Sequence, residues 1–356
     1  MLSRAGWQTG PVIESELLVV SEQPLNAETP LATQEGRLTR TSRHYVRNHF
    51  PIPAPPDSIA IDGAVASALA LTLDDLRALG ARTLAVTLEC AGNGRRFLDP
   101  PVPGEQWGLG AVGTAEWRGV PLRALLRRAG VRPNAVEIVF RGADEGEPQD
   151  LGRRIAYERS LPLADALRDD VLVAWGMNGD VLPAEHGAPF RLVVPGWYGM
   201  ASVKWLARIT AVERPFTGFY QLDRYVIDGA PLRAIRPRAV ITAPVDGATI
   251  RAGALSLRGY AWSGSAPLAR VEVSAGPHRS AASWREAELA PATAAYVWRE
   301  FRTELLIATG SGGPLETTLL ARATDAAGHA QPLEPKHNVL GYANNAVSPV
   351  RVRVVP

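Results

Sequence analysis

The sequence of 356 residues contains only one cysteine, Cys90. Disulfide bonds within the chain, thiolate-held iron–sulfur clusters and attached c-type haem each need at least two cysteines, so all three are excluded. Cys90 is therefore an inert packed thiol, a nucleophile or a single soft ligand to a metal. Free cysteine is among the most often buried residue types, which makes a packed thiol the default interpretation.

Long apolar runs and a strong net charge are also missing. The formal net charge of +2 is too small to indicate nucleic acid or a membrane surface as the partner. No uninterrupted apolar run approaches the length of a bilayer-crossing helix. Residues 1–7 lack an apolar signal core and a twin-arginine pair, so we expect a cytoplasmic location if Met1 is the natural start. A periplasmic location would require that an export signal had been removed.

The first two thirds of the chain mix two kinds of pattern. Apolar runs typical of strands lie at 84–88, 136–140 and 171–175. Helical patterns follow Thr72, a good N-cap residue, and Pro121, which is favoured at helix starts. A chain of this length suits two domains, and these patterns predict an α+β domain over residues 1–236.

The pattern changes near the prolines between residues 231 and 244. Short alternating segments divided by Gly, Pro, Ser and Asp follow, and the clearest are at 255–260, 269–273, 317–322 and 350–354. Such segments are typical of antiparallel strands in a sandwich. We therefore predict an all-β, immunoglobulin-like sandwich domain over residues 237–356.

The turn after the predicted strand at 84–88 surrounds Cys90 with residues that favour reactivity. It reads Glu-Cys-Ala-Gly-Asn-Gly-Arg-Arg from Glu89 onward. Gly92 and Gly94 allow the backbone to bend tightly, and the two arginines that follow favour the thiolate over the thiol. This turn is one of three polar segments in which arginine or histidine stands near glycine or proline.

The other two segments supply linked motifs. Arg47-Asn48-His49 precedes a Pro-x-Pro, and His186 opens a His-Gly-x-Pro-x-Arg-x-x-Val-Pro-Gly motif with Lys204-Trp205 downstream. With Cys-Ala-Gly-Asn and its arginines, the order and approximate spacing resemble the sulfite oxidase family of molybdopterin-dependent oxidoreductases, in its haem-free, bacterial type. The resemblance runs from about Thr39 to the C-terminus, where the β domain is similar to that family's dimerisation domain.

The resemblance implies a cofactor built from molybdenum and molybdopterin. Cys90 matches the cysteine that donates a thiolate to molybdenum, and a soft thiolate suits such a sulfur-rich metal. A phosphate monoester calls for guanidinium, ammonium and hydroxyl donors. The positions that resemble those binding the pterin and its phosphate are Asn48, His49, Asp144, His186, Arg191, Ser202 and Lys204.

The resemblance also implies a pocket for an anionic substrate. Tyr225 matches a tyrosine beside the metal, Arg47 and Arg96 match arginines of the anion pocket, and Trp107 matches an aromatic wall. Gly94 is an extra residue, which leaves open whether Arg95 or Arg96 points inward. Leu340 stands where the vertebrate-type enzymes carry an arginine, so the pocket has one positive charge fewer.

The implied reaction is the oxidation of sulfite to sulfate by oxo transfer, with electrons passed to an external acceptor such as a cytochrome. The resemblance also implies a homodimer. Leu340 leaves open another oxyanion or sulfur compound, including chemistry of the nitrate reductase type. Two alternatives come from other functional classes. The first is a hydrolase in which Cys90 is the nucleophile, His49 or His186 its base, and Asp144 the residue that orients the base. The second is a non-catalytic binding module. The signature surroundings of cysteine proteases are missing, and a binding module leaves the arginine and glycine loops unexplained.

Overall fold

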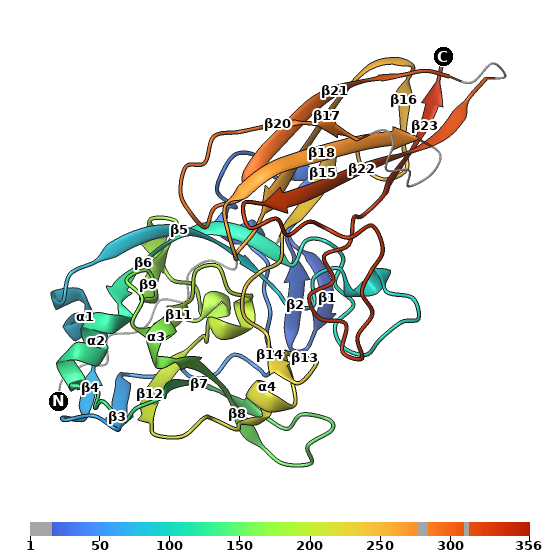
Figure 1. Cartoon of the computed structure of the whole chain (residues 1–356). Coiled ribbons are helices and arrows are strands. Elements are labelled where there is room, and N and C mark those ends of the chain that lie inside the picture. Colours follow the sequence, from blue (N-terminus) through green and yellow to red (C-terminus); the bar gives the residue numbers. More distant parts are fainter. Residues whose placement is uncertain (1–15, 277–283, 310–312) are drawn as a thin grey trace.

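The computed structural model describes residues 16–276, 284–309 and 313–356 (Figure 1). A larger N-terminal domain, made of two five-stranded sheets and short helices, is followed by an elongated all-β sandwich. This arrangement confirms the predicted fold class. The exact division at residues 236 and 237 stays a prediction, and residues 1–7 lie outside the described part of the chain.

The first sheet of the N-terminal domain carries Cys90 at the end of β5. Its strands follow the path β10-β9-β6-β5, with β11 paired to β9, and all of these pairs are antiparallel. The predicted runs at 84–88 and 171–175 fall in β5 and β9. The bounds are β5 (Arg82–Glu89), β6 (Val112–Pro121), β9 (Leu172–Met177), β10 (Asp180–Val181) and β11 (Arg191–Val193).

The second sheet of this domain faces the first across the core and has the order β4-β3-β12-β7-β8. β12 pairs parallel with β3, and the predicted run at 136–140 falls in β7. The sheet consists of β3 (Ile59–Gly63), β4 (Leu69–Leu71), β7 (Glu137–Gly146), β8 (Ile155–Pro162) and β12 (Leu206–Val212). Two small hairpins lie beside it, β1 (Leu18–Glu22) with β2 (Leu25–Glu28), and β13 (Val226–Ile227) with β14 (Ala230–Pro231).

The helices are short, and the two that the sequence predicts begin where expected. Thr72 caps α1 through a capping box with Asp75, and Pro121 precedes α2, which ends at Gly130 in a left-handed conformation with φ of 66°. The α-helices are α1 (Leu73–Ala78), α2 (Leu122–Ala129), α3 (Leu163–Ala166) and α4 (Phe219–Leu222). The 3₁₀ helices are η1 (Leu31–Thr33), η2 (Thr41–Arg43), η3 (Arg95–Phe97), η4 (Ala184–His186) and η5 (Gly199–Ala201). None of the helices within the described ranges is long and apolar enough to cross a bilayer.

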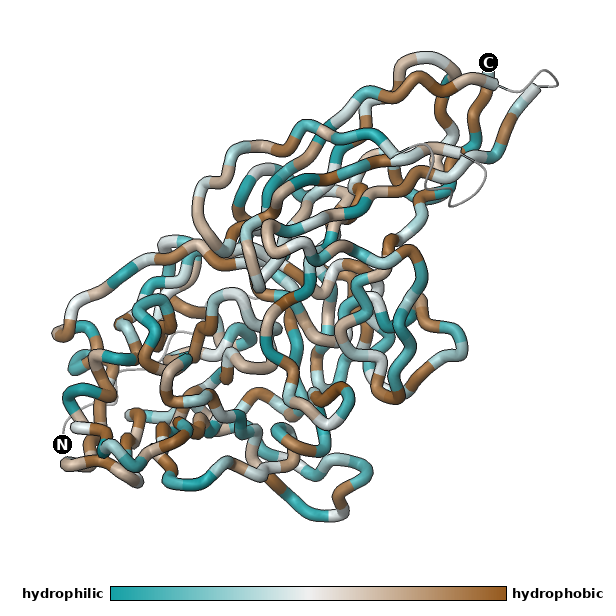
Figure 2. The backbone as a smooth tube through the Cα atoms, viewed as in Figure 1, coloured by the Kyte–Doolittle hydropathy of each residue, from teal (hydrophilic) through white to brown (hydrophobic). Residues whose placement is uncertain are grey.

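The C-terminal domain stacks a four-stranded sheet on a five-stranded one. Apolar and polar residues alternate along its strands (Figure 2), so one face of each sheet supplies the core and the other faces solvent. One sheet contains β15 (Arg238–Ala243), β17 (Gly253–Trp262), β21 (Arg299–Ile307) and β20 (Glu288–Leu289). The other contains β16 (Ala248–Arg251), β23 (Val350–Val355), β22 (Leu315–Asp325), β18 (Leu268–Gly276) and β19 (Arg285–Glu286).

The two domains share buried contacts directly beneath the sandwich. The main apolar cluster of the N-terminal domain continues into Tyr260, Trp262 and Trp298 of the sandwich. Trp298 N donates a hydrogen bond of 2.9 Å to Thr87 Oγ1 on β5. The segment between β22 and β23, red in Figure 1, descends from the sandwich to the N-terminal domain, where Ala343 N donates to Ala91 O at 2.7 Å. The C-terminal domain is therefore bonded to both ends of the segment that carries Cys90.

Candidate active site

A cavity lies at the end of β5. Its lining brings together most of the residues predicted from the sequence, although they come from strands, loops and 3₁₀ turns of the whole N-terminal domain. The predicted residues on its wall are Arg47, Asn48, His49, Cys90, Asp144, His186, Arg191, Ser202, Lys204 and Tyr225. The three polar segments thus meet around one cavity.

Cys90 lies on the boundary between packed core and cavity. Its side chain is buried, and it packs against the apolar cluster around Leu88 and Trp107 while also lining the cavity. The backbone fixes its position, because Cys90 N donates to Ala111 O at 2.8 Å. Burial raises the pKa of the Cys90 thiol, and the positive charge of Arg47 opposes this shift. Among the residues that the structure describes, no histidine is hydrogen-bonded to the Cys90 sulfur, so a base for a hydrolytic nucleophile is not in place.

Three cations line the cavity without carboxylate partners within ion-pair distance among the described residues: the buried Arg191 and the half-buried Arg47 and Lys204. Arg191 Nη1 and Nη2 donate to the carbonyl oxygens of His186 and Ser202, each at 3.1 Å. Lys204 Nζ donates to Glu185 O at 2.7 Å and to Asn48 Oδ1. Burial lowers the pKa of Arg191 to about 10 and lowers that of Lys204 as well. Cations with only neutral acceptors make the cavity a site for an anion.

Several polar atoms in the cavity wall lack a partner in the described chain. Asp144 Oδ1 and His44 Nε2 are buried and form no hydrogen bond. Burial raises the pKa of the Asp144 carboxyl, and burial lowers the pKa of His44 to about 4. Ser202 Oγ accepts from Val194 N at 3.1 Å, which leaves its hydrogen free to donate. These groups can serve a ligand that carries both donors and acceptors.

Tyr225 and His49 form a close pair on the cavity wall. The Tyr225 hydroxyl lies 2.6 Å from His49 Nε2, and the His49 ring is stacked on Tyr157 with ring centroids 4.7 Å apart. Burial, with Arg47 and Lys204 nearby, lowers the pKa of His49 well below its usual value, so the imidazole is neutral. Tyr225 adopts a left-handed backbone conformation with φ of 56°, which is uncommon for a tyrosine and typical of residues held for function.

Arg47 is held by a residue that sequence reasoning did not find. Asn26, on β2, is fully buried, and its Oδ1 accepts from Arg47 Nη1 at 3.2 Å and from Asn48 N at 2.8 Å. A lone asparagine in a strand gives no signal of this role in the sequence. His44 was also not assigned a role from the sequence, because only its orientation into the cavity distinguishes it from a packed histidine.

Two further predicted residues, Arg96 and Trp107, lie outside this cavity wall, and so does Arg95, the alternative to Arg96. Arg96 is exposed, whereas Arg95 is buried and donates to Leu340 O at 3.1 Å and to Glu105 O at 2.8 Å. Gly94, with φ of 81°, turns the chain so that the first arginine points inward. Trp107 is fully buried in the cluster around Cys90. The assignment of Arg96 and Trp107 to the substrate pocket therefore stays a prediction.

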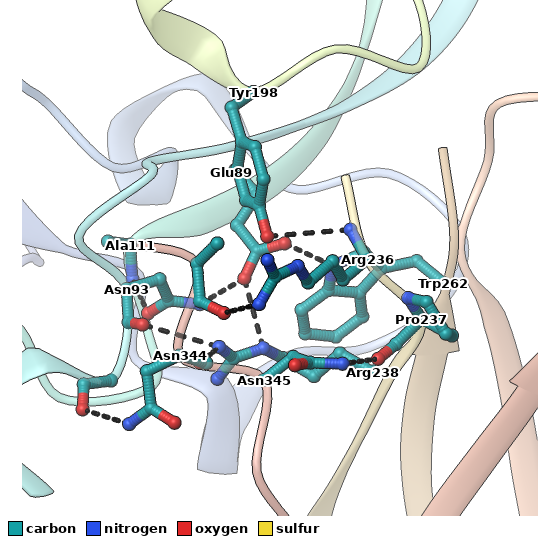
Figure 3. Close-up of polar contacts among 12 residues, drawn as sticks. Glu89, Asn93, Ala111, Tyr198, Arg236, Pro237, Arg238, Trp262, Asn344 and Asn345 are labelled. Atoms are coloured by element: carbon teal, nitrogen blue, oxygen red, sulfur yellow. Dashed lines mark hydrogen bonds and ion pairs between the residues drawn. The ribbon is translucent and has the colours of Figure 1, made fainter. Parts of the chain in front are cut away.

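Side chains of the C-terminal domain bind the turn that carries Cys90 on the side away from the cavity (Figure 3). Glu89 Oε1 lies 3.0 Å from Arg238 Nε, and Glu89 Oε2 accepts from Trp262 Nε1 at 2.8 Å. Asn93 Nδ2 donates to Glu89 Oε1 at 2.9 Å, and Asn344 Nδ2 donates to Gly94 O at 2.9 Å. Burial raises the pKa of Glu89, and the Arg238 charge opposes this shift. Both sides of the turn are thus fixed by side chains of the sandwich domain.

Comparisons with known proteins agree with this geometry. Residues 49–220 match the oxidoreductase molybdopterin binding domain, and residues 232–355 match the Mo-co oxidoreductase dimerisation domain. The chain is 32% identical to the mitochondrial sulfite oxidase of Drosophila melanogaster, covering 98% of this chain and 65% of that protein. It is 34% identical to the mitochondrial sulfite oxidase of Rattus norvegicus, covering 98% of this chain and 68% of that protein. The chain therefore spans about two thirds of the length of these two relatives.

Two other similar proteins bear on the chemistry. The NADH nitrate reductase of Solanum lycopersicum is 31% identical, covering 96% of this chain and 41% of that protein. The crystal structure of the sulfane dehydrogenase SoxCD from Paracoccus pantotrophus superposes with a TM-score of 0.80 at 26% identity. That superposition covers 98% of this chain and 92% of the other chain.

Proposed function

This chain belongs to the sulfite oxidase family of molybdopterin-dependent oxidoreductases, and we propose that it oxidises sulfite to sulfate and passes two electrons to an external acceptor. The observation that carries the proposal is the cavity in which one thiol, Cys90, shares a wall with three cations that lack carboxylate partners among the described residues. An anionic cofactor and an anionic substrate both suit this charge distribution.

The residues present fit a molybdenum cofactor. Cys90 Sγ would supply a thiolate ligand, while Arg191, Lys204 and the free hydroxyl hydrogen of Ser202 would hold the phosphate. The unpartnered atoms of Asp144 and His44 would meet donors and acceptors of the pterin. When bound, this cofactor supplies two-electron redox chemistry coupled to oxygen-atom transfer.

The chain's own residues position the substrate and move protons. The Arg47 guanidinium, beside Cys90 and Tyr225, would hold the anion by charge-assisted hydrogen bonds. The Tyr225 hydroxyl, 2.6 Å from the neutral His49 ring, can hold or pass a proton as charge changes on the substrate. The buried wall restricts water, which strengthens each of these interactions.

Two partner classes follow from this proposal. Oxidation of sulfite releases two electrons, so the reaction needs an oxidant, and we propose a small cytochrome as the acceptor. The match of residues 232–355 to a dimerisation domain supports a homodimer formed through the sandwich. A second candidate reaction, of the nitrate reductase type, is favoured by the 31% identity to an NADH nitrate reductase and by Leu340, at a position where the resemblance to the vertebrate-type enzymes implies an arginine.

The two candidate reactions are separated by one comparison. Purified holoenzyme is assayed with sulfite and an artificial electron acceptor, and with nitrate and an artificial electron donor. Sulfite-dependent reduction of the acceptor, together with about one molybdenum per chain, supports the proposal. Nitrate reduction without sulfite turnover would overturn it.

A further inference from the structure

Arg159 on β8 is a buried cation to which the proposed mechanism gives no role. Its side chain is 1% exposed, and no carboxylate lies within ion-pair distance of it in the described part of the chain. Nη1 donates to Tyr220 O, whereas Nε and Nη2 have no hydrogen-bond partner there. An unpaired buried charge is destabilising, so a charge retained at this position calls for a physical explanation.

The guanidinium of Arg159 lies directly behind the cavity wall. Side chains alternate across a strand, so Tyr157 and Arg159 share one face of β8, and Tyr157 lines the cavity. Arg159 Cζ is 5.8 Å from the ring centroid of Tyr225, which also lines the cavity. This separation is within the range of a cation–π interaction. Only one layer of aromatic rings therefore separates this charge from the cavity.

The rings of Tyr225 and Tyr342 are stacked, and a guanidinium group lies near each of them. The Tyr225 ring is stacked on Tyr342 of the C-terminal domain, with centroids 4.9 Å apart and an interplanar angle of 28°. Arg95 Cζ lies 5.3 Å from the Tyr342 centroid. Arg95 has two carbonyl acceptors, whereas the Arg159 guanidinium has one. Glu137 acts electrostatically on Arg159 but lies beyond ion-pair distance, so the guanidinium keeps an unpaired charge among the described residues.

Of the cations that line the cavity, Arg47 is the one that acts electrostatically on both Cys90 and Tyr225. It also acts on Lys204, which with Arg191 lies at the end assigned to the phosphate. Arg95, which does not line the cavity, acts on Cys90 as well. Leu340, whose backbone oxygen accepts from Arg95 Nε, adds no charge of its own.

We propose that Arg159 determines the preference of the substrate end for doubly charged oxyanions. It is a positioning residue that does not touch the substrate, and its charge behind the Tyr225 ring supplies positive potential that Leu340 does not. This inference rests on the proposed function, because it places the substrate at the Cys90 end. Since electrostatic energy scales with ligand charge, a dianion gains about twice as much as a monoanion from the same potential.

The test measures equilibrium binding of sulfate and of nitrate to the holoenzyme by titration calorimetry. Arg159→Met should weaken sulfate binding by about five- to tenfold and nitrate binding by about two- to threefold, because the two anions differ in charge. Arg159→Lys keeps the charge and should stay within about twofold of the unaltered enzyme. Arg141→Met removes an exposed cation from the neighbouring strand β7 and serves as the matched control, with no change expected.

A kinetic measurement completes the test. The KM for sulfite should rise in parallel with the sulfate dissociation constant, while kcat changes by no more than about twofold. Should Arg159→Met lose its cofactor, Arg159→Gln replaces it, because the amide keeps a donor for Tyr220 O.

Unchanged sulfate binding in the neutral variant would overturn the inference, and so would equal losses for sulfate and nitrate. Failure of Arg159→Lys to retain binding, or absence of sulfate binding to the unaltered holoenzyme, would overturn it as well. If the unaltered enzyme does not oxidise sulfite but its sulfate binding still depends on Arg159, the proposed reaction fails and this inference stands.

Discussion

Glu89 and Arg238 form a fully buried ion pair, 3.0 Å from Oε1 to Nε, that joins the residue before Cys90 to the first strand of the C-terminal sandwich (Figure 3). The same carboxylate accepts from Asn93 and Trp262, so one side chain fixes the Cys90 turn and the interface between the domains. The position of the candidate metal ligand therefore depends on both domains.

Breaking this ion pair should destabilise the protein strongly. Arg238→Met leaves the Glu89 charge buried and unpaired, and we expect a loss of about 3 to 5 kcal/mol in the free energy of unfolding. Denaturant unfolding measures this loss, and molybdenum content reports whether the Cys90 turn keeps its shape. The double variant Glu89→Gln/Arg238→Met should recover part of the loss. Arg302→Met, which breaks the exposed pair with Glu288, is the control, and an equal loss there would contradict the assignment.

Replacing Arg47 should weaken substrate binding more than cofactor binding. Arg47→Gln removes the cation beside Cys90, and we expect the KM for sulfite to rise by at least about tenfold with a smaller loss of bound molybdenum. Arg96→Gln is the informative comparison: the resemblance, which assigns Arg96 to the anion pocket, predicts a rise in the KM, whereas its exposed position outside the cavity wall predicts an unchanged KM. An unchanged KM in Arg47→Gln, or an equal rise in Arg96→Gln, would show that a different arginine faces the substrate.

Asn26 should influence the substrate only through Arg47. Asn26→Ala removes the acceptor for Arg47 Nη1 and Asn48 N, so we expect a rise in the KM for sulfite that is smaller than that of Arg47→Gln. In the Arg47→Gln background the same substitution should add little further change, because the two residues act as one unit. Steady-state kinetics of the four proteins test this, and fully additive effects would contradict the coupling.

The ion pair of Glu272 with Arg322 on the sandwich should make stability depend on pH. The hydrogen bond from Arg322 holds the pKa of Glu272 below its usual value of 4.5. The carboxylate therefore stabilises the folded state above pH 4.5, and this contribution disappears as the pH falls through the lower folded value. Glu272→Gln should lower the free energy of unfolding at pH 7 but not near pH 3, whereas Glu316→Gln, at an exposed position, should do neither. An equal loss at both pH values would contradict this account.

Much of the fold and most of the cavity lining could be predicted from the sequence. Thr72 and Pro121 marked helix starts because caps act locally, and the Cys90 turn was readable because its glycines and arginines are contiguous. The partners of the buried charges could not be predicted from the sequence. Glu89 meets Arg238 from the other domain, and Arg159 on β8 meets Tyr225 from a loop far along the chain, contacts that no local pattern encodes.

For a similar reason, the sequence could not predict whether Arg95 or Arg96 points inward. Both arginines stand in the same motif, and their direction depends on the left-handed conformation of Gly94. A turn with an extra glycine permits several backbone paths, so the sequence alone leaves the choice open. The contact of Arg95 with Leu340 O, made across the domain interface, decides which side chain points inward.

The most direct test of the central claim is X-ray absorption at the molybdenum edge, measured on the unaltered holoenzyme and on Cys90→Ser. The serine hydroxyl is a poorer soft ligand than a thiolate, so the variant should keep its fold, lose activity and show one sulfur neighbour fewer at molybdenum. Identical sulfur coordination in the two proteins, or absence of molybdenum from the active unaltered protein, would contradict the account.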